Sequence, residues 1–446
     1  MRKLIPLYLL CIPSLFAQKG ALEAGPMPGY SAKREVQLWL QTKSPASIQV
    51  QYWRQENPRQ VLLTDPIETS MQQECVAHVS IGNLEPGATY EYDVLVDQKK
   101  VPHTERWKFK TQPLWEWRTD PPAFTVAFGS CAYVNEPEYD RPGKPYGSDY
   151  SIFDTIAAVR PDLMLWLGDN TYLREVDWDS RSGILHRYRH TRSLQELQRL
   201  LSCTHHYATW DDHDYGPNNS DRSYGLKGIT LDAFKLYWAN PSYGLDNAPG
   251  VFYQFRWNDV DFFVLDDRFH RSPNTEKANP AKTMLGAEQK QWLKDALLGS
   301  RAPFKVIVSG TQMISTSGGD EAFNLFADER SELLSFIKSN RIPGVLFLSG
   351  DVHHSELLKL EDPEFYPLYD FTSSSLTAGL YVPKDKEISP MMVPGTLVSD
   401  RHNFGILRFD GKFRDRTLTM ETRDITGNIR WSVSIHERDL RPENTR

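Results

Sequence analysis

The feature that most constrains the fold is a pattern that recurs along the chain: a short apolar run stops and polar side chains follow at once. The polar positions are Cys131, Asp169, Asp211, Asp267 and Asp351. In layered α/β proteins, ligands bind outside the strand ends, so side chains far apart in sequence meet in one cleft. A single aspartate at a strand end is more often a turn or a helix cap. A repeated series of metal-type residues instead indicates a site.

Apolar runs and amphipathic stretches alternate over residues 121–446. The runs FTVAFGSC, DLMLWLGDN, FKVIVSGTQ and GVLFLSGDVHH have the length and composition of buried strands, and stretches such as GAEQKQWLKDALLGS have helical periodicity. The tail from residue 403 is typical of antiparallel hairpins. We therefore expect an α/β (α+β) fold for this part of the chain.

Residues 18–115 have a different pattern. Short alternating runs such as SIQVQYW and TYEYDVLVD are separated by turn residues, which is typical of an immunoglobulin-like or fibronectin-like β-sandwich. The segment PLWEWRTDPP, residues 113–122, is the expected linker. No catalytic residues cluster in the first part, so we expect a small accessory domain there.

The first residues predict export. A charged start, Met1 to Lys3, precedes a mostly apolar run to Phe16, and this is the pattern of a signal peptide over residues 1–17. The run is shorter than the roughly 20 residues of a transmembrane helix. We expect a secreted, periplasmic or cell-surface protein, with lipid attachment at Cys11 as a minor alternative.

The mature chain would have an odd number of cysteines. Without Cys11, the chain retains Cys75, Cys131 and Cys203, so at least one of them does not form an internal disulfide. The net charge of −7 gives no basic surface for a nucleic acid. An anionic substrate would therefore need local cations.

Three motifs supply candidate ligands. In GDNTY, Asp169 is able to bridge two cations, and Tyr172 is a hard anionic ligand suited to Fe³⁺. Alone, this motif is more simply a capping aspartate beside a packed tyrosine.

In TWDDHDYGPNN, the crowded carboxylates of Asp211, Asp212 and Asp214 would repel one another without cations. A solvated acidic loop is the alternative, but the apolar residues before the motif favour a metal site.

The third motif, LFLSGDVHH, places His353 two residues after Asp351. Neutral imidazole is a common ligand for transition metals, whereas His354 is more simply structural. Cys131 is a plausible thiolate ligand, and its alternative role is that of a small buried apolar residue.

These residues together resemble a known family, the PhoD-like alkaline phosphatases of the calcineurin-like metallophosphoesterases, which are akin to purple acid phosphatases. The matching segments are GSC, WLGDNTY, TWDDHDYGPNN, FFVLDDRFHR and LFLSGDVHHSE, in the family's order. The resemblance implies a four-layer α/β sandwich over residues 121–446, preceded by the all-β domain. It also implies a secreted enzyme that acts in phosphate acquisition.

The resemblance further implies Fe³⁺ and Ca²⁺ as cofactors, with two divalent cations such as Zn²⁺, Mn²⁺ or Co²⁺ as the alternative. Carried over by position, the iron ligands are Cys131, Asp169, Tyr172 and Asp351, and Asp169 bridges to calcium. The calcium ligands are Asp212, Asn219 and His353, with Asp211 and Asn218 as open alternatives to the first two.

Two positions depart from the family's pattern. Asp214 stands where glutamate is common, and Asp267 stands where threonine is common before the arginine. An extra carboxylate near the site would alter the metal preference or narrow the range of substrates.

The expected reaction is hydrolysis of small phosphate monoesters, with diesters as a second class. His353 or water would protonate the leaving oxygen, and Arg268 would either clamp a phosphate oxygen or form a structural ion pair. Loops 134–150 and 216–250 would form walls of the pocket. The alternatives are a phosphodiesterase acting on wall polymers, phospholipids or nucleotides, and a non-catalytic calcium-binding surface protein. The sequence does not indicate an oligomeric state.

Overall fold

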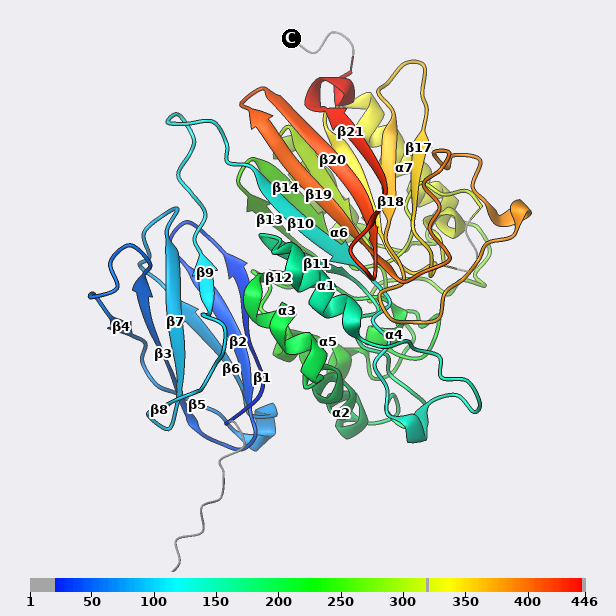
Figure 1. Cartoon of the computed structure of the whole chain (residues 1–446). Coiled ribbons are helices and arrows are strands. Elements are labelled where there is room, and N and C mark those ends of the chain that lie inside the picture. The colour runs from blue at the N-terminus through cyan, green and yellow to red at the C-terminus, as the bar shows by residue number, and fades with distance from the viewer. Residues whose placement is uncertain (1–20, 318–320, 443–446) are drawn as a thin grey trace, which may run out of the picture.

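The computed structural model describes residues 21–317 and 321–442 (Figure 1). The expected signal peptide, including Cys11, lies outside the described residues. Strands and one short 3-10 helix, Met71–Gln73, form the first part of the chain, and a mixed α/β part follows it.

The first part is built from two antiparallel sheets. One has the order β1-β2-β6, with bounds Leu22–Ser31, Val36–Thr42 and Val76–Ile81. The other has the order β4-β3-β7-β8, with bounds Leu62–Leu63, Ser47–Arg54, Thr89–Val96 and Lys99–Lys100. Two short strands join its flanks, β5 (Ile67–Glu68) and β9 (Lys108–Lys110). Inward side chains such as Leu38, Val50 and Tyr92 form one buried core.

Strand β1 was not expected from the sequence. Its residues LEAGPMPGYS include two glycines and two prolines, which predict turns rather than a strand. The structure accommodates them because β1 is an edge strand with three irregularities in its register to β2.

The second part contains two six-stranded sheets. The first has the order β12-β11-β10-β19-β20-β21, with bounds His205–Thr209, Leu163–Leu167, Phe124–Gly129, Asn403–Lys412, Asp415–Asp424 and Ile429–His436. The second has the order β13-β14-β15-β16-β18-β17, with bounds Tyr253–Trp257, Val260–Val264, Phe304–Val308, Val345–Ser349, Leu368–Thr372 and Glu356–Leu360. Parallel pairing joins β10 to β11 to β12, and β14 to β15 to β16.

Side-chain alternation explains the layers. On β10, Val126 and Phe128 belong to the same core as Ile307 of the second sheet, whereas Ala127 packs with Ile156 of a helix. Helices α1, α2, α3 and α5 cover the first sheet, and α6 and α7 pack on the second; their bounds are Ser151–Val159, Arg181–Arg192, Gln198–Cys203, Lys227–Tyr237, Ala287–Gly299 and Ala327–Ser339. This arrangement confirms the expected layered α/β fold (Figure 1).

The β-sandwich contacts the first sheet of the α/β part along β1 and β12. The Tyr30 N–H donates to the Ala239 carbonyl at 2.9 Å. His205 on β12 forms a hydrogen bond at each of its ring nitrogens. Its Nε2 accepts from the Lys110 N–H at 3.1 Å, and its Nδ1 lies 2.8 Å from the Gly29 carbonyl oxygen. Backbone atoms of the sandwich therefore hold a buried histidine of the other part.

Among the described residues, Cys75, Cys131 and Cys203 are all free thiols. No helix of residues 21–317 or 321–442 is long and apolar enough to cross a membrane.

Candidate metal centre

The polar residues that follow the parallel strands lie together at the carboxyl ends of those strands. Cys131, Asp169, Asp211 and Asp351 each stand two residues after the last residue of a parallel strand, β10, β11, β12 and β16. Because the parallel strands of each sheet run in one direction, these positions share one edge.

Five of the predicted ligands have a left-handed backbone although none is glycine. Their φ angles are 60° at Cys131, 51° at Asp169, 61° at Asn219, 70° at Asp351 and 59° at His353. Such conformations are uncommon for L-residues and cluster at active sites, where the surrounding structure holds them. The backbone turns sharply at each strand end and there directs a side chain into the site.

Two glycines permit the close approach of these turns. A Cβ on Gly310 would lie 2.7 Å from Asp211 Cγ and 2.8 Å from Asp267 Oδ2. A Cβ on Gly350 would lie 2.5 Å from Ser130 Cβ. The site therefore requires small residues where the two sheets converge.

Two groups of ligand atoms share Asp169. Cys131, Asp169 and His353 form one, and Asp169, Asp212 and His213 form the other; within each, the candidate ligand atoms lie within 4.8 Å of one another. The Cys131 Sγ lies 3.7 Å from Asp169 Oδ2. A carboxylate common to both groups is the arrangement expected for a bridge between two cations.

This grouping differs from the expected ligand assignment at two points. Asp351, which was expected to bind iron, belongs to neither group. His353 stands with Cys131, whereas the resemblance implied that it accompanies Asp212. His213, which the sequence did not single out, takes that place. Its only sequence indication is its position beside Asp212.

Tyr172 lies between the two groups. It is 1% exposed, its hydroxyl is 3.4 Å from His353 Nε2, and its ring stacks on His213 with centroids 4.3 Å apart. The Nδ1 of His353 lies 2.5 Å from the Gly379 carbonyl oxygen. That contact places hydrogen on Nδ1 and leaves Nε2 free to accept.

The buried anions lack sufficient countercharge. Burial, followed by the charge of Asp212, raises the pKa of Asp169 well above its ordinary range. Burial raises the pKa of the Cys131 thiol to about 11 and, with Glu321 and Asp212, that of Asp351 to about 7. Burial also opposes ionisation of Asp212, but His213, Arg268 and the Asn219 N–H outweigh it and lower its pKa to about 2.

The donor set fits metal ions. Thiolate, phenolate, imidazole and carboxylate atoms converge in a buried space, and like charges there are costly without cations. The buried His213 Nδ1 has no hydrogen-bonding partner among the described residues. Cations would provide both the missing countercharge and the missing partner.

Asp211 and Arg268 form a neighbouring ion-pair network. Arg268 is fully buried, donates through Nε to Asp211 Oδ1 at 2.5 Å, and also pairs with Glu321. Asp267 is buried, and its Oδ2 accepts from the Thr311 N–H at 3.0 Å. Arg268 thus forms buried ion pairs with Asp211 and Glu321, while its Nη1 has no hydrogen-bonding partner among the described residues. Asp212 belongs to a group of close ligand atoms, and Asp211 does not. Glu321, in a loop without a motif, was not identifiable from sequence.

Asp214 and Asn219 support the same loop. Both oxygens of Asp214 accept from the Asn170 N–H, at 3.1 and 3.2 Å, and Oδ2 also accepts from the Asp211 N–H at 3.1 Å. The Asn219 N–H donates to Asp212 Oδ2 at 2.6 Å. Asp214 therefore stabilises the start of α4 (Asp212–Tyr215), and Asn219 orients Asp212 through its backbone.

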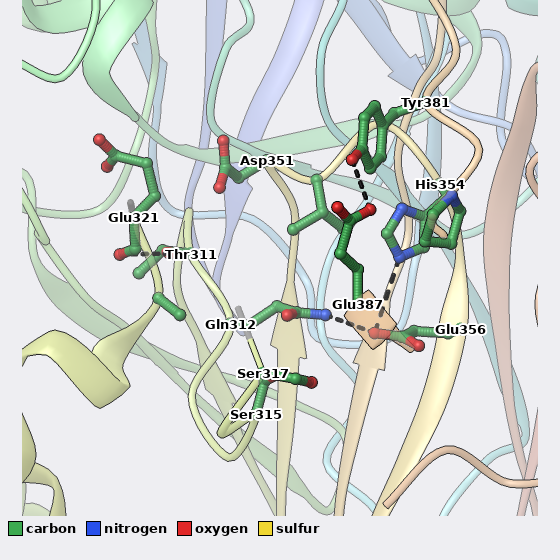
Figure 2. Close-up of a pocket in the computed structure, with 13 residues that line it drawn as sticks. Thr311, Gln312, Ser315, Ser317, Glu321, Asp351, His354, Glu356, Tyr381 and Glu387 are labelled. Carbon is green, nitrogen blue, oxygen red and sulfur yellow. Dashed lines mark hydrogen bonds and ion pairs between the residues drawn. The ribbon is translucent and has the colours of Figure 1, made fainter. Parts of the chain in front are cut away.

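A cavity of about 320 Å³ opens beside Asp351. Figure 2 shows Glu321 and Thr311 on one side of it, and His354, Glu356, Tyr381 and Glu387 on the other. Its walls come from residues 311–317, 321–322, 351–356 and 381–387. The expected wall loops contribute elsewhere: Tyr146 contacts His353, and Asn219 borders a second cavity of about 390 Å³.

Comparison with known proteins assigns the two parts separately. Residues 126–414 match the family described as PhoD-like phosphatase, and residues 19–114 match a domain of unknown function, DUF7800. Alkaline phosphatase D of Bacillus subtilis (strain 168) is 26% identical over 357 residues, which is 68% of this chain. The match spans 58% of that relative's length.

Solved structures show the same fold. One described as the structure of PhoD has a TM-score of 0.78 at 19% identity, covering 98% of this chain and 94% of its own. The purple acid phosphatase PPD1 from seeds of yellow lupin (Lupinus luteus) has a TM-score of 0.64 at 12% identity, covering 93% of this chain and 75% of its own. On its sequence match over residues 126–414, the chain belongs to the PhoD-like phosphatase family.

Proposed function

We propose that this chain is an exported, metal-dependent phosphoesterase that hydrolyses small phosphate monoesters. The observation that carries the proposal is the pair of buried ligand groups that share Asp169. Family membership and the name of the Bacillus subtilis relative support the reaction class. Export rests on the sequence of residues 1–17.

Cys131, Asp169, Tyr172 and Asp351 would hold Fe³⁺, and Asp169 and Asp212 would hold Ca²⁺. Cys131, Asp169 and Asp212 belong to the two groups of ligand atoms, whereas Tyr172 and Asp351 rest on the family resemblance. Thiolate and phenolate favour the more highly charged metal, and carboxylate oxygens suit calcium. We assign His353 to the thiolate side and add His213 to the other side, as their positions indicate. Two divalent cations remain the alternative pair.

When bound, the cations would neutralise phosphoryl oxygens and lower the pKa of water. The residues of the chain would hold the cations and orient the side chains around them. The Gly379 carbonyl holds the hydrogen of neutral His353 on Nδ1, so that Nε2 would either bind metal or, after taking up a proton, pass that proton to the leaving oxygen. Arg268 holds Asp211 and Glu321 and in this proposal acts as a positioning residue.

The test is steady-state hydrolysis of 4-nitrophenyl phosphate and bis(4-nitrophenyl) phosphate after loading with Fe³⁺ and Ca²⁺. We expect turnover of the monoester at the higher kcat/KM. A large preference for the diester would make the chain a phosphodiesterase. No turnover of either ester would overturn the proposed function.

A further inference from the structure

The cavity beside Asp351 has an unusual balance of charge. Among the described residues that line it, the carboxyl groups belong to Glu321, Asp351, Glu356 and Glu387, and none is a lysine or an arginine. Glu321 is already paired with Arg268 and Arg271. Asp351 belongs to the proposed metal centre. The remaining two carboxylates require a separate explanation.

Glu356 is a buried carboxylate without a cationic lysine or arginine partner among the described residues. It is 4% exposed, its Oε1 accepts from Gln312 Nε2 at 2.8 Å, and the same oxygen lies 3.7 Å from His354 Nε2. A buried carboxylate is costly unless it is paired. The cavity is where a bound cation would reach it.

Glu387 lines the same side of the cavity as Glu356, but from the segment 381–387. Its Oε2 accepts from the Tyr381 hydroxyl at 2.6 Å and from the Lys384 N–H at 2.9 Å. The hydrogen bonds from Tyr381 and from the Lys384 N–H, together with the charges of Lys384 and Lys386, lower the pKa of Glu387. Figure 2 shows Glu387, Glu356 and Tyr381 on the same side of the cavity.

His354 supplies an independent indication of a ligand. It is 8% exposed and lines the cavity, and its Nδ1 has no hydrogen-bonding partner among the described residues. Since Nε2 faces the Glu356 carboxylate, hydrogen on Nε2 is favoured and Nδ1 is left as an acceptor. The cavity is thus rich in acceptors, and a ligand with charged N–H donors would satisfy them.

We propose that this cavity is the subsite for the alcohol part of the phosphoester and that it selects an alcohol carrying an ammonium group. The inference rests on the proposed function, because Asp351 lines the cavity and interacts electrostatically with Asp212 and His353 of the two ligand groups. The phosphoryl group would lie at Asp351, and the ammonium group would lie between Glu356 and Glu387. An alcohol with a carboxylate would meet repulsion from the same groups.

Three stable phosphonates of matched length test the charge preference: 2-aminoethylphosphonate, 2-hydroxyethylphosphonate and 3-phosphonopropionate. Each is measured as an inhibitor of hydrolysis of the chromogenic ester that the metal-loaded full chain turns over best. We expect the inhibition constant to rise in that order, with about a tenfold or larger gap between the ammonium and carboxylate compounds. Equal constants, or tighter binding of the hydroxyl compound, would overturn the proposal.

Variants of the two cavity glutamates test whether they cause the preference for the ammonium compound. Glu387→Gln and Glu356→Gln should each reduce the ratio between the ammonium and hydroxyl compounds, by about three- to tenfold. Glu387 ends the short 3-10 helix Asp385–Glu387 and is partly exposed, so its variant remains informative even where that of the buried Glu356 fails to fold. Glu364→Gln, an exposed carboxylate paired with Lys338 outside the cavity, is the matched control. An unchanged ratio in a folded Glu387 variant would contradict the assignment.

The two proposals fail in different ways. Turnover without any charge preference removes the ammonium subsite and leaves the phosphoesterase intact. Absence of turnover on both chromogenic esters removes both. A preference that persists in both cavity variants moves the subsite elsewhere, for example to the cavity beside Asn219.

Discussion

Tyr172 is buried and contacts both ligand groups, through its hydroxyl at His353 and through its ring at His213. Its ring stacks on His213, and its neighbour Tyr133, with ring centroids 5.0 Å away, directs its own hydroxyl to Asp140. The two tyrosines share one environment, but only Tyr172 contacts the His353 side chain.

This difference gives the first prediction. If Tyr172 binds Fe³⁺, the iron-loaded chain has a visible charge-transfer band that Tyr172→Phe abolishes. Tyr133→Phe should retain the band because its hydroxyl points away from the ligand atoms. Absorption spectra of the two variants at matched iron content decide the point, and an unchanged band in Tyr172→Phe would remove this residue from the centre.

We predict that Asp214 stabilises the folded state and does not bind metal. Asp214→Ala removes the acceptor for the buried N–H groups of Asn170 and Asp211. Leaving two such donors unpaired should lower the free energy of unfolding by roughly 2–4 kcal/mol. Asp214→Asn should cost less because it keeps one acceptor oxygen. Chemical denaturation measures both, and equal loss in the two variants would argue against a hydrogen-bonding role.

At the scale of elements, the turns after the strands determine the site. The approach of the turn after β15 to the turn after β12 depends on Gly310, which has no room for a Cβ beside Asp211 and Asp267. Any side chain there moves a strand end, and with it the ligands.

Gly310→Ala should therefore reduce kcat/KM by about 100-fold, since displacement of about 1 Å can cost that much. Gly299, at the end of α6, is the matched control, because a Cβ there meets no atom within 4 Å. Gly299→Ala should retain full activity and stability. Normal kcat/KM in Gly310→Ala would show that the turn tolerates movement.

The sequence predicted the strand-end residues because each strand is a short apolar run with a visible end, as at Asp169 and Asp351. It did not predict His213 or Glu321, since their positions depend on how two sheets face each other rather than on any local pattern. Helix α5, over Lys227–Tyr237, falls in a region that was expected to be a loop. Local periodicity identifies elements well, whereas contacts between elements are set by the tertiary structure.

On the scale of the whole molecule, the neutral side chain of His205 joins the β-sandwich to the α/β part. Burial, with a smaller contribution from the charge of Lys110, lowers the pKa of His205 to about 4, and in the neutral form its Nε2 accepts from the Lys110 N–H. In the unfolded chain the pKa is near the ordinary value of about 6.5. The unfolded state therefore binds the proton first as the pH falls.

Stability from His205 is complete above about pH 6.5 and is lost progressively as the pH falls towards 4, by roughly 3 kcal/mol in total. His205→Gln should have lower stability at pH 7 but a smaller loss between pH 7 and pH 4. Denaturant unfolding at several pH values measures this. A pH dependence equal to that of the parent chain would exclude His205 as a contributor.

The shared carboxylate of Asp169 provides the most direct test of the central claim, which is that one residue serves two metal ions. The measurement is the metal content per chain, by elemental analysis, of the purified protein, of Asp169→Asn and of the exposed control Asp154→Asn. We predict about two metal ions per chain in the parent and in the control, and loss of both in Asp169→Asn. A parent without stoichiometric metal, or an Asp169→Asn variant with its full complement, would contradict the proposed centre.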